Sequence, residues 1–94
     1  MNRDADLRVR KMLGRSHLNA RRFEDAFGIY ASILQSYPDD VEANLTLADL
    51  YLASNNHRVA VQLYRPVQEL DPDRQGLQRR LELARSGPKP DLTW

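Results

Sequence analysis

The sequence predicts an all-α protein built as a stack of antiparallel helix hairpins. The main observation is a repeat, because two stretches of the 94-residue chain match each other at an offset of 34 residues. Apolar residues within each copy recur mostly every three or four positions, as one face of a helix requires. A proline closes each copy and disfavours a continuing helix. A fixed period of this length is typical of helix–turn–helix arrays. The matching pairs are Leu13 and Leu47, Leu18 and Leu52, Ala26 and Ala60, Tyr30 and Tyr64, Pro38 and Pro72, and Asp39 and Asp73.

The first copy, residues 7–40, is expected to form two helices. The first of them spans residues 7–18, and a polar turn over residues 19–22 separates it from the second. A second apolar stripe over residues 23–34 predicts the partner helix, which ends before Pro38. The apolar positions that are expected to form one face of the first helix are Leu7, Val9, Met12, Leu13 and Leu18.

The second copy, residues 41–74, opens with an acidic pair at capping-box spacing, Asp39 and Glu42. Its two helices are expected on either side of residues 54–56, where asparagine suits the left-handed conformation of a tight turn. Pro66 lies inside the second of these helices and is expected to kink it, because proline cannot donate the backbone hydrogen bond.

A truncated third copy follows, and it predicts a capping helix over about residues 75–85. This segment is less apolar than the earlier helices, as expected for a helix with one solvated face. Glycine and two prolines end helical structure after residue 86. The predicted organisation is therefore one domain over residues 1–86 and a flexible tail over residues 87–94.

Composition excludes several classes of site. The chain has no cysteine, and its two histidines, His17 and His57, have no second ligand at metal-binding spacing. No Gly-rich phosphate loop or nucleophile elbow is present, so we expect no enzyme, cofactor or metal site. No apolar run approaches the roughly 20 residues of a membrane span, and the charged N-terminus does not resemble a signal peptide. We therefore expect a cytoplasmic protein.

Charge is segregated along the chain although the net charge is only +1. Residues 1–22 hold seven basic and two acidic side chains, whereas residues 23–73 hold two basic and nine acidic ones. Residues 74–94 are basic again, with five basic and two acidic side chains. The basic first helix makes nucleic-acid binding the alternative to protein binding, although the acidic middle and the lack of interleaved aromatic residues make it the weaker one.

These motifs together resemble the tetratricopeptide repeat (TPR) family over roughly residues 5–85. The family pattern places a small residue in the first helix of each hairpin, here Gly14 and Ala48, where the paired helix crosses closely. The resemblance implies a right-handed superhelical stack of two TPR units and a capping helix. The other matching residues are Leu13, His17, Phe23, Ala26, Tyr30, Ile33 and Pro38 in the first copy, and Leu47, Tyr51, His57, Ala60, Tyr64, Val67 and Pro72 in the second.

The resemblance also implies a binding groove, because the first helix of each hairpin lines the concave side of such arrays. The groove is expected to have a basic end, an apolar floor at Leu18, Leu45 and Leu52, and an acidic spot at Asp49. A peptide or helix of a partner protein with an acidic group and apolar anchors fits this description. The residues expected to face the groove are Arg8, Lys11, Arg15, Leu18, Asn19, Glu42, Leu45, Asp49, Leu52, Ala53, Arg79 and Leu83.

Some TPR proteins clamp a C-terminal carboxylate with basic and amide side chains. Lys11 and Arg80 match two positions of that clamp, but Arg15, Thr46 and Gly76 replace the others, so the clamp is incomplete. A second expectation follows from the small number of repeats. Since about three repeats are needed for independent stability, the chain is expected to pair with a second copy through its exposed repeat ends or to form part of a larger array.

Overall fold

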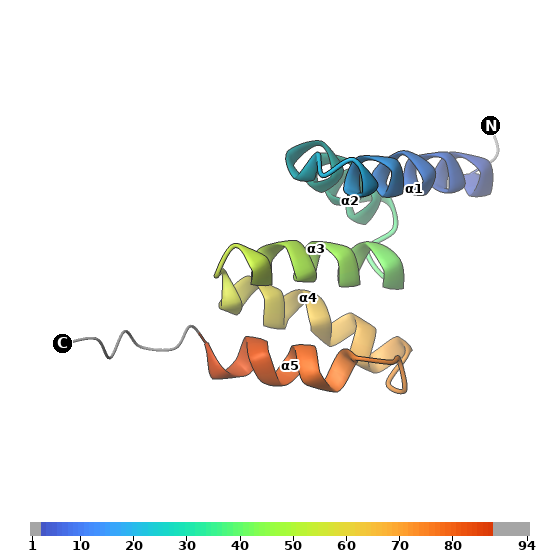
Figure 1. The fold of residues 1–94 in the computed structure, drawn as a ribbon. Coiled ribbons are helices and arrows are strands. Elements are labelled where there is room, and N and C mark those ends of the chain that lie inside the picture. Colours follow the sequence, from blue (N-terminus) through green and yellow to red (C-terminus); the bar gives the residue numbers. More distant parts are fainter. Residues whose placement is uncertain (1–2, 88–94) are drawn as a thin grey trace.

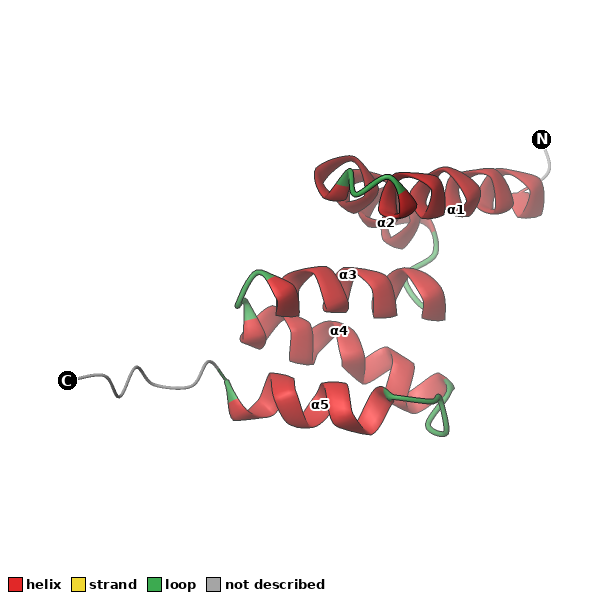
Figure 2. Cartoon of the chain, in the orientation of Figure 1, coloured by secondary structure: helices red, strands yellow, loops and turns green. Residues whose placement is uncertain are grey.

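The computed structural model describes residues 3–87, and it confirms the all-α fold. Five helices account for most of this part of the chain, and it contains no strand (Figure 2). The helices are α1 (Arg3–Asn19), α2 (Phe23–Ser36), α3 (Val41–Ala53), α4 (His57–Leu70) and α5 (Leu77–Ser86).

The helices form a stack in which each packs mainly on its neighbours in sequence. Helices α1 and α2 form one antiparallel hairpin, α3 and α4 form the next, and α5 follows (Figure 1). Helix α1 therefore belongs to one end of the stack, and α5 lies at the other. This is the helical repeat stack that the 34-residue period predicts.

Two hydrophobic clusters hold the stack together, one at each junction between a hairpin and the next helix. Each centres on a fully buried tyrosine, Tyr30 in the first cluster and Tyr64 in the second. The first cluster joins α2 to α3 and also contains Ala26, Ile33, Ala43 and Leu47. The second joins α3, α4 and α5 and also contains Leu45, Ala48, Ala60, Val67, Leu77, Leu81 and Ala84.

Gly14 allows α1 and α2 to approach closely, as the repeat pattern predicts. A Cβ atom at this position would lie 2.6 Å from Cε2 of Tyr30. Such a contact is far inside van der Waals distance, and the fully buried Tyr30 ring has little room to move. The glycine therefore sets the distance between the two helices of the first hairpin.

The tight turns follow the predicted pattern, with small shifts at the helix ends. Arg21 and Asn55 adopt left-handed backbone conformations, with φ of 60° and 64°, in the turns of the two hairpins. Gly76 also has a positive φ of 82°, and α5 begins directly after it at Leu77. The last helix thus starts about two residues later than the expected start at about residue 75, because the left-handed residue interrupts the helical path.

Helix α3 is capped by Asp40, which corrects the capping box expected between Asp39 and Glu42. Asp40 has extended backbone dihedrals, and its Oδ2 accepts a hydrogen bond of 2.9 Å from the backbone N–H of Ala43. The neighbouring Asn44 is buried, and its amide donates to the backbone oxygens of Pro38 and Asp40. The helix begins one residue later than expected, and this leaves the carboxylate of Glu42 for a contact with α1.

Two other local expectations met different outcomes. The apolar residues of α1 do not form one face: Leu7 and Leu18 are half-buried, whereas Val9, Met12 and Leu13 are exposed. Helix α4 continues through Pro66 to Leu70 as a single element, and the expected kink at Pro66 stays a prediction.

No helix of residues 3–87 combines the length and the apolar character that a membrane span requires. The tail expected over residues 87–94 lies, apart from Gly87, outside the described part of the chain.

Candidate functional site

The face of α1, α3 and α5 expected to form a groove is held together by two polar clusters. We call this surface the inner face. Ion pairs join α1 to α3 and α3 to α5 across it, although a hairpin partner lies between these helices in the sequence. Most of the residues predicted for the groove are accessible there.

The first polar cluster links α1 to α3 through Glu42. Arg15 donates two hydrogen bonds to this carboxylate, from Nε to Oε2 at 2.8 Å and from Nη2 to Oε1 at 2.5 Å. The Tyr30 hydroxyl of α2 donates to Oε2 of Glu42 at 3.2 Å. Lys11 Nζ lies 2.8 Å from Oδ1 of Asp40 and 3.9 Å from Oε1 of Glu42. Such a bidentate pair fixes the orientation of the Arg15 guanidinium and balances its positive charge.

The protonation of this cluster follows from its contacts. Burial opposes the charged form of Glu42, but the hydrogen bonds and positive charge of Arg15, together with Lys11, outweigh burial and lower the pKa of Glu42. Burial, with the negative charge of Glu42 nearby, raises the pKa of Tyr30 to about 12. At neutral pH the cluster therefore contains an ionised carboxylate and a neutral phenol.

The second polar cluster links α3 to α5 through Asp49. The Tyr64 hydroxyl of α4 donates to Oδ1 of Asp49 at 2.5 Å, and Nε of Arg80 lies 3.5 Å from the same oxygen. Burial raises the pKa of Asp49, and the Tyr64 hydroxyl and the charges of Arg80 and Arg74 offset only part of that effect. The pKa of Tyr64 is also raised, first by burial and then by its hydrogen bond to Asp49.

A row of equivalent positions crosses the inner face, and two of its residues, Arg15 and Asp49, belong to these clusters. Arg15, Asp49 and Leu83 are separated by 34 residues each and come from α1, α3 and α5. Arg15 and Leu83 are exposed, and Asp49 is half-buried. A ligand that lies across the three helices would meet a cation, an anion and an apolar side chain in that order.

The other predicted groove residues are not equally accessible. Arg8, Asn19, Ala53 and Arg79 are exposed, and Lys11, Leu18 and Leu52 are half-buried.

Leu45 differs from the expectation, because it is buried in the second hydrophobic cluster and contributes little to the floor of the groove. The cation of α5 that pairs with α3 is Arg80, whereas the predicted Arg79 points to solvent. The Leu45 assignment is therefore corrected, whereas the assignment of the exposed Arg79 to the groove stays a prediction.

Sequence reasoning did not connect the tyrosines with the site. Tyr30 and Tyr64 were expected as packing residues, yet their hydroxyls reach the carboxylates of the inner face. The available signal was that a buried tyrosine usually needs a hydrogen-bond partner. Phenylalanine would fill the same space without that requirement.

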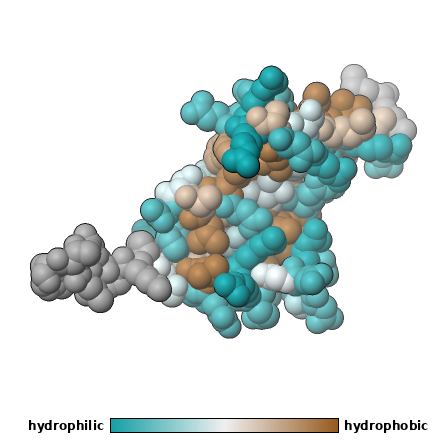
Figure 3. Space-filling view, in the orientation of Figure 1, coloured by the Kyte–Doolittle hydropathy of each residue, from teal (hydrophilic) through white to brown (hydrophobic). Residues whose placement is uncertain are grey.

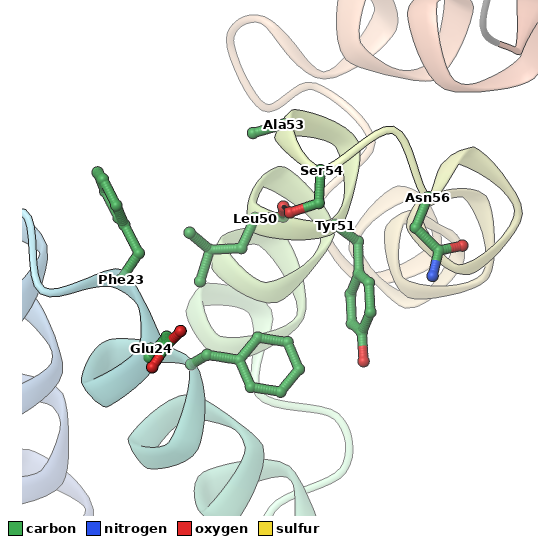
Figure 4. A pocket seen from close by; sticks show the side chains of 8 residues that line it. Phe23, Glu24, Leu50, Tyr51, Ala53, Ser54 and Asn56 are labelled. Carbon is green, nitrogen blue, oxygen red and sulfur yellow. Dashed lines mark hydrogen bonds between the residues drawn. The ribbon is translucent and has the colours of Figure 1, made fainter.

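A separate pocket lies between the two hairpins, where α2 begins and α3 ends (Figure 4). Its volume is about 620 Å³. Phe23, which is exposed, and Leu50 lie on opposite sides of the pocket, at the start of α2 and near the end of α3 (Figure 4). Phe27 and Tyr51 pack edge to face within it, with ring centroids 5.2 Å apart. The remaining lining residues are Glu24, Ala53, Ser54 and Asn56.

Residues 3–87 contain no group of three histidine, cysteine or acidic residues that could hold a metal ion. The acidic groups of the inner face are held by arginine, lysine or tyrosine, and the pocket is mostly apolar. The two surfaces therefore offer charged groups, hydrogen-bonding groups and apolar side chains.

Comparison with known proteins gives one match. A family model for the tetratricopeptide repeat matches residues 17–82, which is more than half of the chain. No curated protein and no solved structure matches the sequence.

Proposed function

Since the chain belongs to the tetratricopeptide repeat family, we propose that it is a non-catalytic protein-interaction module that binds a peptide or helix of a partner protein along its inner face. The binding surface in this proposal is the row formed by Arg15, Asp49 and Leu83, with Leu18 and Leu52 beside it. A cytoplasmic setting, and a place in a larger assembly, belong to the same proposal.

The observation that carries the proposal is the pair of polar clusters to which Arg15 and Asp49 of this row belong. Each cluster spans two helices of the inner face, so the spacing of the row is fixed before any ligand arrives. A surface that is already ordered loses less conformational entropy on binding. The exposed Leu83 supplies an apolar anchor. Arg15 keeps more than half of its side chain accessible, so the N–H groups that Glu42 does not use remain available as hydrogen-bond donors to a ligand.

The Arg-rich first helix gives less support to the nucleic-acid alternative. Arg10 pairs with Asp6 at 3.1 Å, Lys11 with Asp40 and Arg15 with Glu42. These cations are balanced by carboxylates of the same chain, so fewer of them are free to replace the counterions of phosphates. For the same reason, Lys11 and Arg80 are poorly suited to clamp a C-terminal carboxylate.

Peptide selection on the intact chain tests the proposal. A displayed library of random peptides of about 12 residues is selected on the immobilised protein, and binding of the enriched peptide is measured by calorimetry. Leu83→Glu introduces a charge into the row and is expected to weaken binding at least about tenfold, or by about 1.4 kcal/mol. The matched control is Leu13→Glu, which changes an equally exposed leucine of α1 that is outside the inner face.

The outcomes separate the candidate surfaces. Loss of binding in Leu83→Glu with full binding in Leu13→Glu supports the inner face. Loss only in Phe23→Ser would move the site to the pocket between the hairpins and contradict the proposal. The nucleic-acid alternative predicts a different pair of results. No peptide would be enriched, and the affinity for a single-stranded DNA probe would fall by orders of magnitude between 50 and 200 mM salt.

A further inference from the structure

The pocket between the two hairpins lies outside the inner face and has no part in the proposed function. Its volume of about 620 Å³ is within the range of about 300–1,000 Å³ that is usual for ligand sites. Three aromatic rings, those of Phe23, Phe27 and Tyr51, line it (Figure 4). Phe23 is 52% exposed, and the other two rings are half-buried. Exposed apolar surface gathered in one place commonly marks an interaction site.

The repeat shows that these rings are not required for packing one hairpin on the next element. The positions 34 residues further along carry no phenylalanine, tyrosine or tryptophan; they hold His57, Val61 and Arg85. At that second junction the His57 side chain contacts α5, with Nδ1 3.2 Å from the backbone oxygen of Leu83. The aromatic lining therefore belongs to the first junction and is not a general feature of the repeat.

The segment that follows α5, residues 88–94, has a sequence suited to an extended chain with one apolar side. Pro88 and Pro90 favour extended backbone for themselves and for the residue between them. Leu92 and Trp94 are two residues apart, and side chains at this spacing project from the same side of an extended chain. Asp91 and Thr93 would then project from the opposite side. The segment thus combines one apolar side with one polar side.

The position of Gly87 brings this segment within reach of the pocket. By the 34-residue period Gly87 is equivalent to Ala53, which lines the pocket, and α5 ends on the edge of the stack where α3 turns into α4 (Figure 1). His57, which contacts α5, directly follows the pocket-lining residue Asn56. Seven extended residues span about 22 Å at about 3.1 Å per residue, which covers two helix spacings of about 8–10 Å each.

Other apolar surfaces fit the segment less well. Val9, Met12 and Leu13 are exposed, and hydrophobic surface is visible over the N-terminal half of α1 (Figure 3). This half of α1 lies at the end of the stack away from α5 and on the edge opposite to Gly87 (Figure 1). The inner face is nearer, but it offers Leu83 as its exposed leucine, whereas the pocket presents three rings.

We propose that residues 88–94 dock into the pocket of their own chain, with Leu92 and Trp94 as the anchors. The two side chains lie between α2 and α3 against the three rings, and Asp91 and Thr93 face water. Aromatic side chains such as tryptophan dominate the energetics of contacts of this kind. Because the segment is tethered, its effective concentration is about millimolar, so a weak intrinsic affinity is sufficient. The docked segment would connect the end of α5 to both hairpins.

Quenching of Trp94 fluorescence by acrylamide in the intact chain tests the docking, because Trp94 is the one tryptophan of the chain. The reference is a synthetic peptide of residues 88–94, in which the indole is fully accessible. At an effective concentration of about 1 mM and a dissociation constant of about 0.2 mM, roughly four chains in five are docked. The quenching constant of the parent chain is therefore expected to be at least about threefold below that of the peptide.

A pair of variants tests the docking surface. Phe23→Ser removes a ring from the pocket and is expected to raise the quenching constant to that of the peptide. Val9→Ser is the matched control, because Val9 is 54% exposed but lies on α1 outside the pocket, and it is expected to leave the quenching unchanged. Circular dichroism verifies that both variants keep the helical content of the parent chain.

A second pair of variants tests which side of the segment enters the pocket. Leu92→Asp places a charge on the apolar side and is expected to make Trp94 as accessible as it is in the peptide. Thr93→Asp introduces the same charge one residue later, on the opposite side, and is expected to leave Trp94 shielded. Neither change affects the described helices, so the folded stack is the same in both variants.

Several results would overturn the proposal. Trp94 that is quenched in the parent chain as strongly as in the peptide is one, and equal effects of Leu92→Asp and Thr93→Asp are another. Shielding that survives in Phe23→Ser but is lost in Leu83→Glu would place the segment on the inner face. Shielding that increases between about 5 and 200 µM protein would mean docking on a second copy, since tethered docking does not depend on concentration.

The docking and the proposed peptide binding can fail independently. Leu83→Glu is expected to weaken peptide binding on the inner face while it leaves Trp94 shielded. Phe23→Ser is expected to release Trp94 while peptide binding on the inner face is retained. The two variants therefore separate the two surfaces in both experiments.

Discussion

The two polar clusters of the inner face use equivalent tyrosines but opposite arrangements of charge. In the first, α1 supplies the cation Arg15 and α3 supplies the carboxylate Glu42. In the second, α3 supplies Asp49 and α5 supplies Arg80. In both, the hydroxyl of a repeat tyrosine donates to the carboxylate. The repeat therefore preserves the tyrosine and the link between helices but not the direction of the ion pair.

The clusters also differ in how far hydrogen bonds and nearby positive charge offset the cost of burying the carboxylate. Glu42 receives two hydrogen bonds from Arg15, and its pKa is lowered. Asp49 has a more distant arginine, and burial raises its pKa despite the Tyr64 hydroxyl. The first cluster should therefore stabilise the fold at neutral pH, whereas the ionised Asp49 contributes little or opposes it.

The largest expected effect tests the close packing of the first repeat. Gly14→Ala places a methyl group against the Tyr30 ring, so we expect the free energy of unfolding to fall by about 2 kcal/mol, even though alanine favours the helix. Equilibrium denaturation with urea measures this change. The second repeat has Ala48 at the equivalent position, in the same hydrophobic cluster as Tyr64.

Gly28→Ala is the control for Gly14→Ala. Gly28 lies in α2, and nothing within 4 Å would meet its added Cβ. This variant should raise the free energy of unfolding by about 1 kcal/mol through helix propensity alone. If both glycine variants were stabilised to the same extent, the close approach of α1 and α2 would not constrain the first repeat.

The next effect compares the two tyrosine hydroxyls. Tyr64→Phe removes the shorter hydrogen bond and leaves Asp49 with an arginine at 3.5 Å, so we expect a loss of about 1.5 kcal/mol in unfolding free energy. Tyr30→Phe should lose only about 0.5 kcal/mol, because Arg15 still satisfies Glu42. Thermal and urea unfolding of the two variants at pH 7 gives the comparison. The reverse order would mean that the Arg15 pair does not compensate Glu42.

The smallest effect separates the two carboxylates. Glu42→Gln is expected to lower the free energy of unfolding at pH 7 by about 1 kcal/mol, because it breaks a charged pair that is partly exposed. Asp49→Asn should be close to neutral, because its carboxylate is already disfavoured in the charged form. A larger loss in Asp49→Asn than in Glu42→Gln would refute the difference between the clusters.

The pH dependence of the stability of the same variants shows whether each ionised carboxylate stabilises or destabilises the fold. The pKa of Glu42 is lowered in the fold, so its stabilising contribution is present above its usual value of 4.5 and is lost as the pH falls below it. The pKa of Asp49 is raised, so the parent chain should gain stability relative to Asp49→Asn as the pH falls from neutral towards 3.8. Melting temperatures between pH 3 and 7 measure both differences.

Much of the fold could be predicted from the sequence, because residues that pack in the same way recur at the same position of each repeat. The 34-residue period located the hairpins, and the small size of Gly14 was correctly attributed to a close helix crossing. The left-handed turn at Asn55 was also correct. These features depend on residues close in sequence or related by the period, and both kinds of relation are visible in one sequence.

The errors concern choices between neighbouring residues and between two faces of a helix. Asp39 and Asp40 are equally suitable caps by type, and only the backbone shows that Asp40 precedes α3. The residues Val9 and Leu13 have the spacing of a core face, but the helix that would cover them is missing from the described stack. The pairing of Arg15 with Glu42 spans 27 residues and has no local signal.

The double role of Asp40 also bears on how the chain folds. One oxygen of this carboxylate caps α3 through Ala43, and the other lies 2.8 Å from the ammonium group of Lys11 on α1. The first turn of α3 is thus stabilised by the helix two places before it, not only by its hairpin partner. Coupling of this kind raises the cost of unfolding one repeat while the next stays intact. It favours the loss of both hairpins in one cooperative transition over unravelling from one end.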